Sequence, residues 1–237
     1  MCGRATITDT GELLPDRFSF TERTNTYDLF QPRFNLCPRQ DIPVVHLDPA
    51  TGNFALRPMH WNLIPGHLRS AAEVERFDRD YSTFNARIER ASSAATFRRP
   101  WQRQRCLVLV DGIIEWTGAK GAKIPHRIRR RDGLPFAMAG LWDHWTGAAP
   151  GDVEIWSCTV LIGPADDWFS QFHHRMARVL APAQYERWLD PDLTDSAAVQ
   201  ALLEKAPYPM ETLVAERISP KVNNPRYDAA DVLLPVA

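Results

Sequence analysis

A segment near the middle of the chain reads RCLVLVDGIIEW at positions 105–116. Its first half, Cys106 to Val110, is a short apolar run rich in β-forming residues, which is typical of a buried strand. Asp111-Gly112 is a turn or bulge signal, and the strand pattern resumes at Ile113. The segment therefore predicts two strands joined by a turn or bulge, and a sheet as the centre of the fold.

Further strand patterns surround this segment, and helical patterns are fewer. Strands are expected at 125–130, 135–142 and 155–162, the last ended by Gly163-Pro164. Helices are expected at 71–79, at 182–189, and from Asp195 or Ser196 through Leu203. Strands and helices do not alternate regularly, which disfavours a parallel doubly wound sheet. We therefore expect one α+β domain over residues 1–237, with a mostly antiparallel, barrel-like core and peripheral helices.

The composition is that of an ordinary globular protein of 237 residues, with 44% hydrophobic and 24% charged residues. The formal net charge of -1 gives no global basic field that would indicate a nucleic-acid partner. Only four of the 28 basic residues are lysines: Lys120, Lys123, Lys205 and Lys221. Arginine binds phosphate bidentately and stacks on bases, so this bias suits a local anion groove. A high-GC genome produces the same bias.

The four cysteines are not arranged as metal ligands. They are Cys2, Cys37, Cys106 and Cys158, with no Cys-x-x-Cys spacing, so a zinc site is not supported. The first residues are polar, and no apolar run approaches the roughly 20 residues needed to cross a bilayer. We expect free cysteines, no metal or cofactor, no membrane contact, and a monomer in the cytoplasm, associated with the nucleoid if the source is prokaryotic.

The amino terminus carries the strongest chemical signal. The chain begins Met1-Cys2-Gly3-Arg4, and a small second residue permits removal of the initiator methionine. Cys2 would then present an α-amine, with a pKa of roughly 7.7–8, beside its thiol. Such an amine attacks an aldehyde, and the thiol closes on the imine to give a thiazolidine. The same thiol and amine also suit an amino-terminal-nucleophile amidohydrolase, and a chance cysteine at a frayed terminus is the alternative to both.

Two polar residues in apolar surroundings are candidate partners of Cys2. Asn85, in Phe84-Asn85-Ala86-Arg87, offers a carboxamide to an oxyanion or a sugar oxygen, and Arg87 offers a guanidinium to a phosphate. A capped turn that leads into a helix, with Arg87 solvated, explains the same residues. Glu115 lies inside an apolar strand pattern. If its side chain faces inward, burial raises its pKa and fits it for proton transfer, whereas on the outer face it is simply solvated.

A histidine pair follows later in the chain, in Phe172-His173-His174-Arg175. His173 titrates near neutral pH and suits an acid or a base, and Arg175 suits a flanking phosphate. A surface turn explains the same residues. The side chains of adjacent residues usually diverge and no further ligands lie nearby, so a zinc site is disfavoured.

Several short motifs occur together in a fixed order. They are Met1-Cys2-Gly3-Arg4, Arg33 to Pro38, Trp61 to Pro65, Asn85-Ala86-Arg87, Arg105 to Trp116, Ala139 to Trp142, and His173 to Met176. Each motif is weak, but the ordered set is specific and spans nearly the whole chain. In this set the chain resembles the SOS response-associated peptidase family, also called SRAP or abasic-site processing proteins.

The resemblance implies a barrel-like α+β domain that cross-links to abasic sites in single-stranded DNA through a thiazolidine on Cys2. Asn85 would orient the amine and sugar, Glu115 would assist proton transfer, and His173 would aid ring opening and cross-link reversal. The residues implied to contact DNA are Arg4, Pro38, Trp61, His67, Arg87, Trp116 and Arg175. The resemblance also implies strand-nicking lyase activity and autoproteolytic clipping of the amino terminus, for which ordinary removal of Met1 suffices here.

The chain departs from the family pattern at five positions: Arg39, Asn62, His67, His174 and Ala177. Glycine is usual at Arg39 and Asn62, and an aromatic base wedge is usual at His67, so a preference for DNA junctions does not follow from the resemblance. Two other functions remain open. One is an amidohydrolase or peptidase that uses the same thiol, and the other is a non-catalytic single-strand binder that acts through arginines and aromatic residues.

Overall fold

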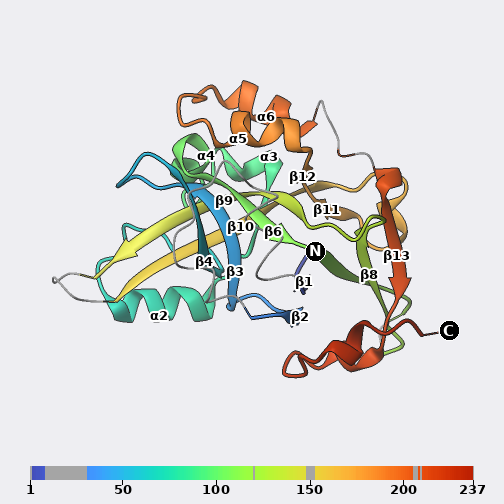
Figure 1. Ribbon diagram of the computed structural model, residues 1–237. Helices are drawn as coiled ribbons and strands as arrows, with labels where there is room; N and C mark the ends of the chain where they lie inside the picture. The colour runs from blue at the N-terminus through green and yellow to red at the C-terminus, as the bar shows by residue number, and fades with distance from the viewer. Residues whose placement is uncertain are drawn as a thin grey trace.

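A closed barrel of five strands forms the centre of the computed structural model, which describes residues 2–8, 31–119, 121–147, 153–204, 208 and 210–236 (Figure 1). The barrel strands are β3 (Asp41–Leu47), β4 (Phe54–Trp61), β6 (Arg105–Val110), β9 (Phe136–Thr146) and β10 (Glu154–Pro164). They pair in the order β10-β4-β3-β6-β9, and β9 pairs again with β10 to close the ring. Only the β4–β10 pairing of this ring is parallel, so the expected mostly antiparallel barrel is confirmed.

A second sheet of five strands lies beside the barrel, on the right in Figure 1. Its order is β13-β8-β7-β1-β2, and every pairing in it is antiparallel. The bounds are β1 (Ala5–Ile7), β2 (Arg33–Leu36), β7 (Gly112–Thr117), β8 (Ile124–Arg130) and β13 (Leu213–Arg217). The first described residues of the chain thus form an inner strand, held on one side by β2 and on the other by β7.

The expected turn at Asp111-Gly112 is the place where the chain leaves the barrel for the second sheet. Asp111 is buried and accepts hydrogen bonds from Thr6 Oγ1, from the backbone N–H and hydroxyl of Thr8, and from Arg127. The carboxylate therefore ties β1, the turn and β8 together.

Three short strands extend the barrel sheet. They are β5 (Asn85–Arg87), β11 (Arg175–Ala177) and β12 (Val179–Leu180). β5 runs parallel to β10, with Asn85 opposite Val160, and β11 runs antiparallel to the end of β10. The long strand β10 thus brings the segments that carry the Asn85 and His173 motifs to the same end of the barrel.

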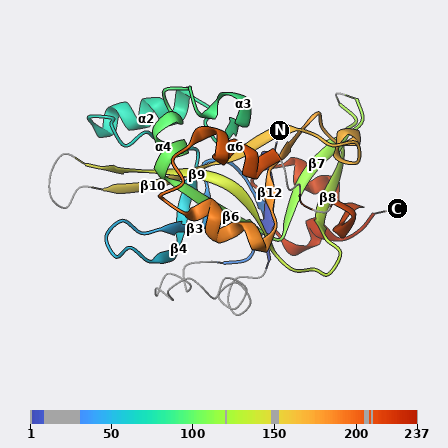
Figure 2. The same ribbon diagram turned by 90° about the horizontal axis from the view of Figure 1, so that it is seen from above.

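The helices lie on the outside of the sheets (Figures 1 and 2). They are α2 (Ala71–Asp80), α3 (Ile88–Ala91), α4 (Arg98–Arg103), α5 (Tyr185–Leu189) and α6 (Ser196–Glu204). Short 3-10 turns are η2 (Phe169–Gln171), η3 (Pro182–Gln184), η4 (Met210–Thr212), η5 (Pro220–Asn223) and η6 (Ala230–Leu233). The three expected helices are therefore confirmed, the one at 182–189 as η3 followed by α5. In the described part of the chain, no helix is long and apolar enough to span a membrane.

The apolar run in β6 is explained by burial on both of its faces. Cys106, Val108 and Val110 belong to one buried cluster, and Leu107 and Leu109 belong to a second cluster that includes residues of α5 and α6. Because side chains alternate along a strand, a strand covered on both faces needs apolar residues at every position. The single α+β domain with a mostly β core is confirmed.

Candidate active site at the amino terminus

The pairing of β1 with β7 places the start of the chain beside Glu115. Ala5 lies opposite Ile113, and the N–H of Ile114 donates to the carbonyl of Arg4 at 2.9 Å. In an antiparallel pair the residues before Ala5 continue alongside those after Ile113. The side chain of Cys2 is fully buried there.

Asn85 holds the backbone of Cys2. Its Nδ2 donates to the carbonyl of Cys2 at 2.7 Å, which joins β5 to the start of the chain. Its Oδ1 is buried and has no hydrogen-bond partner among the described residues. A buried acceptor without a donor costs free energy, so this oxygen is suited to receive a donor that arrives with a substrate or with a new amino terminus.

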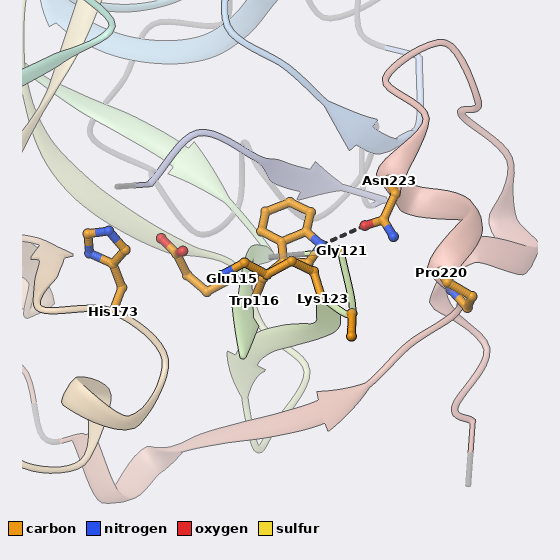
Figure 3. A pocket seen from close by; sticks show the side chains of 8 residues that line it. Glu115, Trp116, Gly121, Lys123, His173, Pro220 and Asn223 are labelled. Carbon is orange, nitrogen blue, oxygen red and sulfur yellow. Dashed lines mark hydrogen bonds between the residues drawn. The ribbon is translucent and has the colours of Figure 1, made fainter. Parts of the chain in front are cut away.

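Glu115 and His173 line one pocket of about 720 Å³ (Figure 3). The carboxylate of Glu115 points toward the imidazole of His173. Glu115 faces inward and is only 4% exposed, and burial raises its pKa from 4.5 to about 7, against the opposing positive charges of the chain's amino terminus and Lys123. A carboxyl group with a pKa near 7 gives and takes protons with comparable ease at neutral pH.

His173 Nδ1 contacts the backbone of Arg175. It can accept the N–H of Arg175 at 2.9 Å when the ring is neutral with its proton on Nε2, and it can donate to the carbonyl of Arg175 at 3.1 Å when Nδ1 is protonated. Burial lowers the pKa of His173 below 6.5, so the neutral ring predominates at neutral pH. The Nε2–H is then a donor for an oxygen of a bound molecule.

The thiol of Cys2 is held in its protonated form. Burial raises its pKa well above the usual value of 9.0, and the negative charge of Glu115 raises it further. A buried thiol of this kind is a poor nucleophile until a neighbouring base removes its proton. Glu115 is the carboxylate whose charge acts on the Cys2 thiol.

Trp116 lines the pocket on the side away from His173, and Arg4 packs against its ring (Figure 3). The indole N–H of Trp116 donates to Asn223 Oδ1 at 2.7 Å, and the guanidinium of Arg4 lies 5.5 Å from the centre of the indole ring. Arg4 Nη1 also donates to Asn35 Oδ1 and to the carbonyl of Val222. Arg4 is therefore held by the protein itself, with its guanidinium beside the pocket wall.

The other two predicted phosphate contacts differ in their surroundings. Arg87, the last residue of β5, is exposed. Arg175 is half-buried and pairs with Glu89 of α3. A phosphate at Arg175 would have to share or displace this ion pair, whereas Arg87 meets an anion without such competition.

The remaining predicted DNA contacts do not gather around the pocket. Trp61 is fully buried and donates from its indole N–H to the carbonyl of Phe84 at 3.0 Å, which leaves its ring no exposed face for a base. We reassign Trp61 as a core residue that supports the strand carrying Asn85. Pro38 is half-buried in the turn after β2, and His67 is exposed in the loop that leads to α2.

Five residues of the pocket were not among the predicted site residues: Gly121, Ala122, Lys123, Pro220 and Asn223. Lys123 lies in the loop between β7 and β8, and Asn223 ends η5, 100 residues further along. The scarcity of lysine in this chain is a weak signal for Lys123, whereas nothing in the sequence around Asn223 indicates its place. No group of three or more His, Cys, Asp or Glu side chains in the described ranges is arranged to hold a metal ion.

The family model described as "SOS response associated peptidase (SRAP)" matches residues 1–225 of the chain. The chain belongs to the SRAP family. Abasic site processing protein YoaM of Bacillus subtilis is 30% identical to this SRAP protein over 98% of this chain and 97% of its own length. YoqW, of the same organism and the same description, is 29% identical over 98% of this chain and 99% of its own length.

Mouse abasic site processing protein HMCES is a more distant SRAP relative, 24% identical over 99% of this chain and 76% of its own length. A crystal structure of a Bacteroides thetaiotaomicron protein superposes with a TM-score of 0.82 at 20% identity and covers 100% of both chains. One from Bordetella bronchiseptica gives a TM-score of 0.74 at 27% identity and covers 92% of this chain and 100% of its own. These structures support the barrel fold.

Proposed function

We propose that this SRAP protein processes abasic sites in single-stranded DNA by forming a thiazolidine between the abasic sugar and Cys2, once the residue before Cys2 has been removed. The observation that carries the proposal is that the Asn85 side chain donates to the Cys2 carbonyl while the charge of Glu115, which lines a pocket with His173, acts on the Cys2 thiol. Relatives that match nearly the whole chain are named abasic site processing proteins, which supports the choice of substrate.

The first step is opening of the abasic sugar. In its closed form the sugar is a hemiacetal, and the aldehyde appears when the ring C1–O bond breaks and the ring oxygen takes up a proton. The imidazolium form of His173 is suited to donate that proton from Nε2, because its Nδ1–H can donate to the carbonyl of Arg175. The C1 hydroxyl gives its proton to the Glu115 carboxylate as the carbonyl forms, so Glu115 is protonated for the next step.

The second step joins the amine of Cys2 to the aldehyde carbon. The buried Oδ1 of Asn85 accepts one amine hydrogen and turns the nitrogen lone pair toward the pocket. Attack gives a carbinolamine, and protonated Glu115 donates a proton to its hydroxyl, which leaves as water. The product is a protonated imine, and Glu115 is now a carboxylate.

In the third step the thiol closes the ring. The Glu115 carboxylate takes the thiol proton, sulfur attacks the imine carbon, and the imine nitrogen becomes the ring N–H. The overall reaction joins one aldehyde to one aminothiol with loss of one water. Reversal uses the same groups in the opposite order, with Glu115 and His173 exchanging their roles as acid and base.

Strand cleavage is a competing outcome of the same imine. The imine acidifies the sugar C2 hydrogens, and loss of one of them expels the 3′ phosphate by β-elimination. Fast closure of the thiol favours the cross-link over this lyase reaction. An amidohydrolase or peptidase would also need the buried Cys2 thiol to lose its proton, and it would then cleave an amide without DNA.

The single strand would follow the rim of the pocket. Arg87 and Arg175 are suited to the phosphates on either side of the abasic sugar, and Trp116 is suited to a neighbouring base. The protein would act as a monomer, since one chain supplies every group named in the reaction. A location in the cytoplasm or at the nucleoid follows from the substrate and stays a prediction.

The test is denaturing electrophoresis with a single-stranded oligonucleotide that carries one abasic site, beside an intact oligonucleotide. Mass spectrometry first confirms that Cys2 is the amino-terminal residue of the purified protein. We expect the native protein to give a shifted band with the abasic strand but not with the intact strand. Cys2→Ala should give no shifted band with either strand. Cys2→Ser keeps the amine but closes no thiazolidine, so its covalent band should require borohydride reduction of the imine.

Each contrary outcome points to one of the alternatives. A shifted band of equal intensity with Cys2→Ala would refute the proposed linkage. Salt-sensitive binding of intact and abasic strands alike, without a covalent band, would indicate a non-catalytic single-strand binder. A shortened oligonucleotide without a shifted band would show that elimination outruns ring closure.

A further inference from the structure

Asn62, the residue after β4, uses every hydrogen-bonding group of its side chain on one neighbouring segment. Its Oδ1 accepts from the N–H of Thr83 at 2.6 Å and lies 3.0 Å from the Thr83 hydroxyl, whose proton is shared with the carbonyl of Leu63 at 2.8 Å. Its Nδ2 donates to Asp78 Oδ1 at 2.7 Å and to the carbonyl of Tyr81 at 3.1 Å. A carboxamide has two donors and two acceptor sites, and this one is fully buried. Segment 78–83 is therefore fastened to the end of β4.

Arg39 holds the same segment from the other side. Its Nε donates to the carbonyl of Asp78 at 2.8 Å, and its Nη2 donates to the carbonyl of Tyr81 at 3.3 Å. Arg39 has a φ of 67°, in the left-handed region that disfavours a residue with a Cβ atom. Its own N–H donates to the carbonyl of Trp61 at 2.9 Å, so the turn that carries Arg39 is bound to β4, next to Asn62.

The fastened segment leads directly to Asn85. The carbonyl of Phe84 accepts the indole N–H of Trp61 and the N–H of Val160, both at 3.0 Å. Asn85 follows as the first residue of β5, and its carboxamide reaches the carbonyl of Cys2. The position of that carboxamide is therefore set by the residues just before it, and Thr83 lies only two positions upstream.

We propose that Asn62, supported by Arg39, is a positioning residue that fixes the Asn85 carboxamide against Cys2. The inference rests on the proposed cross-linking function, in which Asn85 orients the Cys2 amine. Without the Asn62 carboxamide, Thr83 and Tyr81 lose their shared partner and segment 81–84 gains freedom. A displacement of about 1 Å at a positioning group slows a reaction by up to about a hundredfold.

The experiment compares Asn62→Ala and Arg39→Gly in the native background and in an Asn85→Ala background. Cross-linking rates are measured at saturating protein, together with affinity for an intact single strand and the thermal midpoint. In the native background we expect Asn62→Ala to slow cross-linking about tenfold and to leave the affinity for the intact strand unchanged. In the Asn85→Ala background the same substitution should slow cross-linking by less than about twofold. Arg39→Gly should slow it by about two- to threefold and stay folded, because glycine adopts a positive φ readily.

Two results would overturn the inference: a folded Asn62→Ala protein that cross-links at the native rate, or an equal loss in the two backgrounds. Failure of the native protein to cross-link would instead refute the proposed function. In that case the side-chain amide NMR signal of Asn85 tests the inference. If Asn62 positions Asn85, this signal must shift in Asn62→Ala. If Asn62→Ala does not fold, Arg39→Gly carries the test, and an unchanged rate together with an unmoved Asn85 signal overturns the inference.

Discussion

Replacing Glu115 by glutamine should make the protein more stable at alkaline pH while it impairs cross-linking. Burial raises the pKa of Glu115 from 4.5 to about 7. A carboxyl group whose pKa is higher in the folded than in the unfolded chain binds a proton on folding. The free energy of unfolding therefore falls as pH rises from 4.5 to about 7. At about 1.4 kcal/mol per pH unit, the loss amounts to about 3 kcal/mol above pH 7.

Glutamine has a similar shape and does not ionise, so Glu115→Gln escapes this loss. We expect the variant to exceed the native protein by about 3 kcal/mol at pH 8 and to match it near pH 4, apart from a constant offset. Urea unfolding of both proteins at pH 4, 6 and 8 measures the difference. Glu75→Gln, exposed on α2, is the matched control. A difference between native protein and Glu115→Gln that stays constant from pH 4 to 8 would refute the reasoning.

Two further substitutions test the charges around the site. The charge of Lys123 opposes protonation of both Glu115 and His173, so Lys123→Gln should raise both pKa values and move the pH–rate profile of cross-linking to higher pH. Burial raises the pKa of Asp111, but the charge of Arg127 and several hydrogen bonds outweigh it and lower the pKa below 3.8. The stability that Asp111 contributes is therefore present at neutral pH and lost on acidification. Asp111→Asn should cost about 3 kcal/mol at pH 7 and progressively less toward pH 3, as measured by urea unfolding.

Strands and helices were predictable where a local sequence pattern has a local physical reason. The run from Cys106 to Val110 is apolar at every position because β6 is covered on both faces, and β6 occupies nearly the expected residues. The helix from Ser196 begins where Asp195 accepts the N–H groups of Ala197 and Ala198 at 3.2 Å. Closure of the barrel was expected only in outline, because an apolar strand pattern does not specify which strands pair.

The site was predictable as a set of residue types but not as a geometry. Cys2, Asn85 and Glu115 stand in motifs, and the structure brings them together through the pairing of β1 with β7 and the bond from β5. The resemblance implied that Trp61 contacts DNA, whereas the structure buries its ring, because a short motif does not reveal whether its tryptophan faces the core. Lys123 reaches the pocket through a loop, and no periodicity marks such a position.

The inner position of β1 also bears on the order of events during synthesis of the protein. An enzyme that removes the residue before Cys2 needs an extended terminus, and it cannot act on one in which Cys2 is enclosed as it is here. The neighbour β7 begins at Gly112, so at about 5–20 residues per second the ribosome takes roughly 5–20 s to supply it. Processing of the terminus has this interval in which to occur. A chain that folds before the residue preceding Cys2 is removed would not react with aldehydes, because the nitrogen of Cys2 is still in a peptide bond and Cys2 is buried.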